Sequence, residues 1–152
     1  MTKTATTLPQ RADFAFLHPL RVRWSEVDGQ GIVFNPNYLV YFDIAINEYQ
    51  RAIDFTYPHG FAQFGTDMFA VNSSVNFRAP ARYDDELMIG VRLAHIGRTS
   101  YRVQFAIFRG DELLADGINV YVNATRDGHV PAPVPEPFVA KVMEFEKLKP
   151  TR

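Results

Sequence analysis

Residues 21–51 read RVRWSEVDGQGIVFNPNYLVYFDIAINEYQR, and this stretch decides the fold. It begins with the alternation typical of a strand, continues through a glycine-rich turn that carries Asp28, and ends in a long amphipathic helix. Asn35 followed by Pro36 predicts the helix start, because Asn is a favoured cap and Pro lacks an N–H that the first turn would leave unbonded. A carboxylate would then lie beside exposed helix N–H groups, which stabilise negative charge developing on a substrate.

The apolar residues of the predicted helix form one continuous stripe. Their spacing follows the helical period: Tyr38, Tyr41, Phe42, Ala45, Tyr49 and Ala52. The helix is expected to end near Asp54, before a loop that contains proline and glycine. Upstream, Leu20, Val22 and Trp24 alternate with polar residues, which predicts a strand with one buried face.

Four further stretches alternate between apolar and polar residues and predict strands. They lie at residues 67–78, 87–93, 101–107 and 118–123. Short connections such as the hairpin signal Gly110-Asp111 join the later ones, so neighbouring strands should run antiparallel. Phe138, Val142 and Phe145 suggest a short helix near the C-terminus. One long helix packed against one antiparallel sheet is an α+β fold.

Composition narrows the class of protein. A chain of 152 residues is expected to form a single domain over residues 14–152, while the polar residues 1–13 are expected to be disordered or loosely attached. The formal net charge of -1 argues against nucleic acid or an anionic membrane as partner. There is no cysteine, no apolar leader and no segment long enough to span a membrane, so the expectation is a cytoplasmic protein.

The stretch from Asp28 to Tyr38, DGQGIVFNPNY, resembles the D-x-x-G-[HIV]-V-x-x-x-x-Y signature of hot-dog-fold acyl-CoA thioesterases. It is most similar to the 4-hydroxybenzoyl-CoA thioesterase and tol-pal-associated groups. The resemblance continues through residues 75–85 and 97–101, and it covers most of the chain from Leu20 to Pro137. Two departures leave the subgroup open: Ile32 stands where many relatives have His, and Ala45-Ile46 replaces a frequent Ala-Arg pair.

The resemblance implies a five-stranded antiparallel sheet wrapped around one long central helix. It also implies a homo-oligomer, a dimer or homotetramer, whose subunits pair their sheets and share the active site at their interface. The polar side chains of Asn72, Ser74 and Asn76 would then belong to the interface or the pocket. An ordinary solvated strand face is the equally open alternative for these three residues.

By resemblance, Asp28 is the catalytic residue. It could attack the thioester carbonyl as a nucleophile or deprotonate the attacking water, and the sequence leaves both routes open. The backbone N–H of Asn35 is expected to bind the oxyanion, and Gly31 allows the backbone to turn tightly beside the substrate. Without the resemblance, an Asp in a glycine-rich turn is more often a turn former.

Substrate-binding roles are assigned to further residues. Tyr38 ends the signature, and Asp43 could line the acyl pocket, although such a helix carboxylate is more often solvated. By resemblance, the loop of Arg98, Thr99 and Ser100 touches the CoA moiety, where an arginine can bind phosphate. The alternative for Arg98 is an exposed arginine of a hairpin without a role in binding. Lesser candidates for CoA are Arg78 and Arg82.

Other chemistries find no support in the sequence. The four histidines are scattered without metal-ligand spacing, and the motifs of serine hydrolases and phosphate loops are missing, so neither a metal nor a cofactor is expected beyond the CoA of the substrate. A second thioesterase type uses a helix Glu preceded by a His-Gly-Gly stretch, and no such stretch precedes Glu48, so a catalytic Glu48 is not expected.

Two alternative functions remain. A hot-dog hydratase or dehydratase would need a histidine soon after its acid, and none occurs between Asp28 and His59. The second alternative is a protein without catalytic activity, which either binds acyl-CoA or an acyl carrier or serves as a scaffold in an envelope complex.

Overall fold

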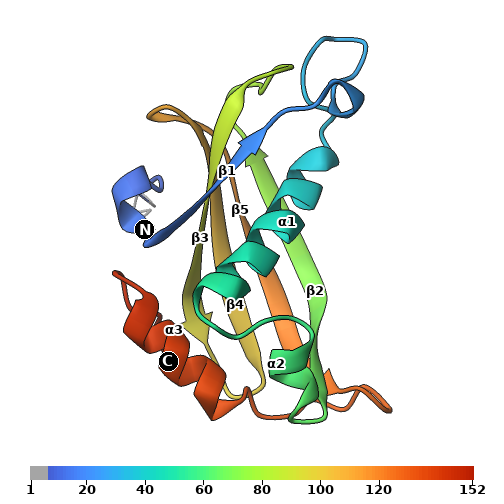
Figure 1. The fold of residues 1–152 in the computed structure, drawn as a ribbon, viewed down its shortest axis with the longest axis vertical. Coiled ribbons are helices and arrows are strands. Elements are labelled where there is room, and N and C mark those ends of the chain that lie inside the picture. Colours follow the sequence, from blue (N-terminus) through green and yellow to red (C-terminus); the bar gives the residue numbers. More distant parts are fainter. Residues whose placement is uncertain (1–6) are drawn as a thin grey trace, which may run out of the picture.

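The computed structural model describes residues 7–152, so the predicted disorder of residues 1–6 lies outside the described residues. Five antiparallel strands form one sheet in the order β1-β3-β4-β5-β2 (Figure 1). The strands are β1 Phe16–Arg21, β2 Thr66–Phe77, β3 Glu86–Ile96, β4 Ser100–Arg109 and β5 Glu112–Thr125. The helices are α1 Asn37–Ala52, α2 His59–Ala62 and α3 Glu136–Phe145, and two 3-10 turns, η1 Arg11–Asp13 and η2 Trp24–Glu26, precede α1.

The long helix α1 lies along one face of the sheet, as Figure 1 shows, and the predicted α+β hot-dog arrangement is confirmed. Its apolar stripe is buried from Tyr38 to Tyr49, whereas Ala52 at its end is exposed. The Phe42 ring stacks on Phe105 of β4 with centroids 4.5 Å apart. Gly117 of β5 makes this close approach possible, because a Cβ there would lie 2.7 Å from the Phe42 ring and 2.1 Å from the Ser74 carbonyl oxygen. The helix and the sheet therefore share one hydrophobic core.

The start of α1 differs from the prediction. The helix begins at Asn37, with Pro36 at the cap position, and no side chain of the described chain caps it. Backbone bonds close the first turn instead, from the Asn37 N–H to the Phe34 carbonyl at 2.9 Å and from the Tyr38 N–H to the Asn35 carbonyl at 3.3 Å. The predicted side-chain cap by Asn35 is therefore wrong.

The first strand is also displaced from its predicted position. β1 ends at Arg21, and Trp24 lies beyond it in η2, where 73% of its surface is exposed. Its indole ring meets Tyr83 edge to face, with centroids 5.3 Å apart. Trp24 therefore belongs to a surface pair of aromatic rings, whereas the strand prediction placed it on a buried face.

The strand β2 forms an edge of the sheet. It pairs with β5 on one side, and no strand within residues 7–152 covers its other side. A bulge between Ala70 and Asn72 leaves Val71 without a partner in β5, and 59% of Val71 is exposed. Residues 70–74 are exposed on both faces, which is unusual for a strand in a folded domain.

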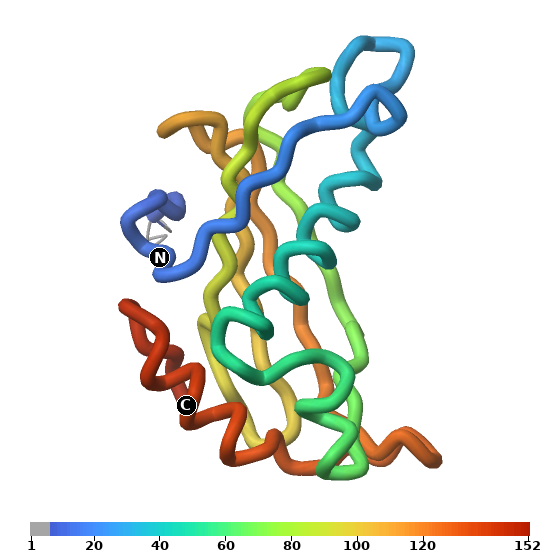
Figure 2. The backbone as a smooth tube through the Cα atoms, viewed as in Figure 1, coloured from blue at the N-terminus to red at the C-terminus, as the bar shows by residue number. Residues whose placement is uncertain are grey.

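The two ends of the sheet carry different loops (Figures 1 and 2). The turn that contains Asp28 and the connection from β2 to β3 lie at one end, beside the start of α1. The turn between β3 and β4 lies at the opposite end, together with α2. Residues far apart in the sequence therefore meet at the Asp28 end.

Candidate active site at the start of the long helix

Asp28 occupies the first position of a tight hairpin turn. Its carbonyl accepts the Gly31 N–H at 2.9 Å, its own N–H donates to the Ile32 carbonyl at 2.9 Å, and Val27 pairs with Val33 at the base. Gly31 has φ +74°, a left-handed conformation that glycine adopts without strain. The sequence DGQG forms this turn because its fourth residue must reverse the chain with positive φ.

The carboxylate of Asp28 is half-buried and only partly engaged. One oxygen, Oδ1, accepts the Gln30 N–H at 2.8 Å. The other oxygen, Oδ2, forms no hydrogen bond with any residue from 7 to 152. The Oδ1 bond fixes the orientation of the side chain and leaves one oxygen able to accept a proton or attack a carbon atom.

The backbone N–H of Asn35 is unbonded within the described chain. The carbonyl of the same peptide unit belongs to Phe34 and accepts the Asn37 N–H at 2.9 Å. Because a trans peptide is planar, its N–H points opposite to its carbonyl, and the Asn35 N–H therefore faces away from the first turn of the helix. An unsatisfied donor at this position can bind an anionic oxygen.

A pocket of about 430 Å³ contains both groups. Asp28 and Asn35 line it together with Tyr38 of α1. The opposite wall consists of the end of β2 and the residues that follow, Phe77 to Pro80. The Phe77 ring meets the Tyr38 ring edge to face, with centroids 5.2 Å apart. The pocket therefore combines an acidic group, a free N–H and an aromatic lining.

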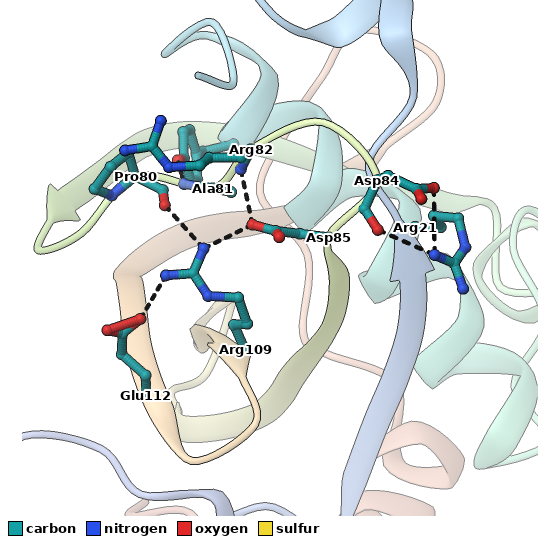
Figure 3. A network of polar contacts seen from close by, with 9 residues as sticks. Arg21, Pro80, Ala81, Arg82, Asp84, Asp85, Arg109 and Glu112 are labelled. Atoms are coloured by element: carbon teal, nitrogen blue, oxygen red, sulfur yellow. Dashed lines mark hydrogen bonds and ion pairs between the residues drawn. The ribbon is translucent and has the colours of Figure 1, made fainter. Parts of the chain in front are cut away.

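A polar network holds the opposite wall in place (Figure 3). Arg109 of β4 donates to the Pro80 carbonyl at 3.2 Å and to the Asp85 carboxylate at 2.7 Å. Asp85 also accepts the Arg82 N–H at 2.8 Å. Next to Pro80, the Ala81 N–H donates to the Tyr38 hydroxyl at 3.1 Å, and the Ala81 carbonyl accepts the Val33 N–H at 2.8 Å. Both walls are thus joined at Ala81.

Two arginines of the connection from β2 to β3 have different environments. Arg78 lines the pocket, and its Nε donates to Asp116 of β5. Arg82 is exposed, and its guanidinium has no hydrogen bond or ion pair among the described residues. In Figure 3 the Arg82 side chain extends away from Asp85 and Arg109. With respect to residues 7–152, Arg82 is therefore an unpaired cation, two residues after Pro80 of the pocket lining.

Sequence reasoning missed one acidic residue beside the site. Glu26 ends η2, two residues before Asp28, and only 6% of its surface is exposed. Burial by itself would raise the pKa of the Glu26 carboxyl, but hydrogen bonds from Arg23 and Tyr41 outweigh that effect and hold the pKa below its ordinary value. The carboxyl is therefore ionised although it is buried. Its sequence neighbours alone gave no sign of this, because the burial comes from α1.

The predicted residues divide into two groups in space. Asp28, Asn35 and Tyr38 meet in the pocket, and Gly31 shapes the turn beside it. Asp43 lines a separate cavity of about 310 Å³, which Tyr57 and Tyr121 also border.

The remaining predicted residues do not reach Asp28 within one chain. Asn72 and Ser74 pair with Val120 and Ile118, on the face of the sheet opposite to Phe42, and both are exposed. Arg98, Thr99 and Ser100 lie at the turn between β3 and β4, at the other end of the sheet (Figure 2). The substrate roles predicted for them stay predictions that require a second copy of the chain.

The polar side chains that line the pocket come from Asp28, Gln30, Asn35, Tyr38 and Arg78. Over residues 7–152, no group of three or more His, Asp or Glu side chains is placed to hold a metal ion. No helix of the same residues is long and apolar enough to cross a bilayer.

Comparison with known proteins identifies relatives. The family model of the Thioesterase superfamily matches residues 30–115, starting two residues after Asp28. The acyl-CoA thioesterase YbgC of Haemophilus influenzae is 23% identical over 103 residues, which are 68% of this chain and 76% of that protein.

Solved structures agree with this match. A protein of Pseudomonas aeruginosa strain PAO1 superimposes with a TM-score of 0.81 and 25% identity, covering 95% of this chain and 99% of its own. A thioesterase of Thermus thermophilus, crystallised with coenzyme A and Zn, gives a TM-score of 0.74 and 26% identity over 88% of this chain and 96% of its own.

Proposed function

The chain belongs to the Thioesterase superfamily, a family of thioester hydrolases, and on this basis we propose that it hydrolyses an acyl-CoA to the free acid and CoA. One observation carries the proposal. The Asp28 carboxylate, of which only Oδ1 is hydrogen-bonded, and the unbonded N–H of Asn35 line the same pocket. Hydrolysis of a thioester needs these two functions, a base or nucleophile and a donor for the oxyanion.

The base route uses Asp28 to take a proton from water. The resulting hydroxide adds to the thioester carbon, and the Asn35 N–H binds the oxyanion that forms. Collapse of this intermediate breaks the carbon–sulfur bond and releases the CoA thiolate, which takes up the proton. Because Oδ1 is occupied by the Gln30 N–H, the free oxygen Oδ2 is the one that accepts the proton from water.

The nucleophilic route uses the same groups in two steps. Asp28 attacks the carbonyl carbon, the CoA thiolate leaves, and a mixed anhydride forms on the carboxylate. Water then cleaves the anhydride and restores Asp28. In both routes Tyr38 and Phe77 form the apolar surface beside the reacting carbon. Arg82, which is exposed and has no ion pair among the described residues, is a candidate cation for the phosphates of CoA.

The proposed active enzyme is a homo-oligomer, a dimer or a tetramer. The exposed edge of β2 supports this, because an uncovered strand edge offers N–H and carbonyl groups to a second copy. Antiparallel pairing of two β2 strands would place the β3–β4 turn of one chain toward the Asp28 end of the other. Arg98 and its neighbours could then contact CoA, as predicted from the resemblance. A cytoplasmic location is part of the same proposal.

A panel of acyl-CoA esters tests the function. Aliphatic esters of increasing chain length and aromatic esters are incubated with the protein, and released thiol is measured with a chromogenic disulfide. We expect hydrolysis of at least one ester well above the buffer rate. CoA that binds without thiol release from any ester would overturn the proposal and favour a binding protein.

A further inference from the structure

The buried carboxylate of Glu26 has no part in the chemistry described so far, and burying a charge without partners is costly. Three donors compensate it. The Arg23 N–H donates to Oε1 at 2.7 Å, the Arg23 guanidinium donates to Oε2 at 2.9 Å, and the Tyr41 hydroxyl donates to Oε1 at 3.1 Å. Tyr41 is fully buried in α1, so the carboxylate is tied to the helix.

The backbone carbonyl of Glu26 forms a second set of bonds. It accepts the Phe34 N–H at 2.9 Å, which closes the base of the hairpin that carries Asp28. It also accepts the side-chain amide of Asn37 at 2.9 Å, at the first residue of α1. Glu26 therefore connects the hairpin at Phe34, the residue before Asn35, to the start of the helix at Asn37.

These bonds lie between the two reacting groups of the pocket. Asp28 follows Glu26 by two residues, and Phe34, which Glu26 holds, directly precedes Asn35. A shift of Glu26 would therefore change the distance between the Asp28 carboxylate and the Asn35 N–H. Glu26 itself is not among the residues that line the pocket, so it does not touch the substrate.

We propose that Glu26 is a positioning residue for thioester hydrolysis, which holds the Asp28 carboxylate and the Asn35 N–H at a fixed separation. The inference rests on the proposed function of this pocket. Positioning acts on the rate of the chemical step, because a misplacement of about 1 Å can cost about a hundredfold in rate. Substrate binding depends on other residues of the pocket and changes little.

Glu146 provides a matched control. It is buried to the same degree, with 1% exposed, and it also accepts a tyrosine hydroxyl, that of Tyr49 at 2.6 Å. It lies beyond α3, where it accepts the Leu93 N–H at 3.0 Å, and it has no contact with the Asp28 hairpin. Glu26→Gln and Glu146→Gln therefore each replace a buried carboxyl group that accepts a tyrosine hydroxyl, at different places in the fold.

The experiment compares kcat and KM for the best ester of the panel, well below the melting temperature of each variant. We expect Glu26→Gln to lower kcat between about tenfold and about a hundredfold, with KM changed by less than about twofold. Tyr41→Phe removes one of the three donors and keeps the ring, so a smaller decrease of kcat is expected. Glu146→Gln should keep the kcat of the wild type. An unchanged kcat in Glu26→Gln, or kcat losses in both Gln variants that follow their losses of melting temperature, would overturn the positioning role.

Amide hydrogen exchange tests the same inference without turnover. We expect Glu26→Gln to accelerate exchange of the Phe34 N–H, which donates to the Glu26 carbonyl, and Glu146→Gln to leave that exchange unchanged. A wild type that releases no thiol would refute the proposed function. Exchange at Phe34 that is equal in Glu26→Gln and wild type would refute the inference about Glu26, whatever the activity.

Discussion

The Ala81 N–H and the Tyr38 hydroxyl are joined by a hydrogen bond of 3.1 Å, in which the amide donates. This bond connects α1 to the loop after β2, and both residues are buried. Replacing Tyr38 by Phe leaves the Ala81 N–H without an acceptor in the core. We expect the free energy of unfolding to fall by about 1–3 kcal/mol, measured by chemical denaturation.

A matched substitution separates the hydroxyl from the ring. Tyr83→Phe removes a hydroxyl from an exposed aromatic residue of the same loop, where water replaces the lost interactions. Its effect on the free energy of unfolding should be close to zero. An equal loss in both variants would contradict the role given to the bond at Ala81.

Asp28→Asn tests the chemistry directly. The amide keeps the shape of the carboxylate, but it can neither accept a proton from water nor attack a thioester at a useful rate. We expect kcat to fall by at least about a hundredfold, measured by thiol release. Asp111→Asn, in the exposed turn between β4 and β5, should keep the wild-type rate. Wild-type turnover in Asp28→Asn would rule out both proposed routes.

Arg82→Gln tests where the CoA phosphates bind. Loss of one exposed ion pair of about 1 kcal/mol corresponds to an increase in KM of about fivefold for an acyl-CoA. The same variant should hydrolyse an N-acetylcysteamine thioester, which lacks the phosphates, like the wild type. Steady-state kinetics with both substrates measure the difference. Equal changes in KM for the two thioesters would exclude phosphate contact by Arg82.

Val71→Lys tests whether the edge of β2 meets a second copy. Two lysines brought together at a strand edge repel, and a solvated monomer avoids this cost. We expect gel filtration with light scattering to show the mass of a single chain and hydrolysis to be lost. Val130→Lys is the control, because Val130 has the same exposure of 59% and lies outside β2. An oligomer that persists in Val71→Lys would argue against pairing through this edge.

Glu146 should give stability an unusual pH dependence. Burial raises the pKa of its carboxyl, although Tyr49, the Leu93 N–H, Arg92 and Lys149 oppose the effect. The folded state therefore keeps a proton that the unfolded chain has already lost, and stability falls as pH rises from the ordinary Glu pKa through the raised one. In Glu146→Gln this decrease should disappear, so the melting temperature of the variant relative to the wild type should rise over the pH range above the ordinary Glu pKa. Parallel curves for the two proteins would show that Glu146 does not titrate in this range.

The main helix and the sheet could be predicted because their signals are local. The period of Tyr38, Tyr41, Phe42 and Ala45 fits only a helix with one buried face, and the alternation of the strands fits only a sheet. The Asp28 turn was equally local, since Gly31 supplies the positive φ that the reversal requires. The wrong predictions concern boundaries. Backbone bonds replaced the side-chain cap of Asn35, and the chain left β1 before Trp24.

The candidate site was less accessible to sequence reasoning. Glu26 acquires its role from Tyr41, 15 residues away in the chain, and from the Phe34 amide across the hairpin. Its burial depends on how the hairpin docks on α1, which no local pattern encodes. Arg98 was linked to Asp28 by resemblance, but one chain holds them at opposite ends of the sheet. Sequence order does not say which contacts form within a subunit and which form between subunits.

The edge-to-face pair of Trp24 and Tyr83 also makes this protein easy to observe. Trp24 is the single tryptophan of the chain, and it lies four residues before Asp28. Its indole is largely solvated, so its emission reports on solvent and on ligands at this end of the molecule. The β3–β4 turn of the same chain lies at the opposite end of the sheet, so a ligand there does not contact the indole ring. The tryptophan fluorescence of the unlabelled protein therefore distinguishes a ligand bound at the Asp28 end from a ligand bound at the β3–β4 end of the same chain.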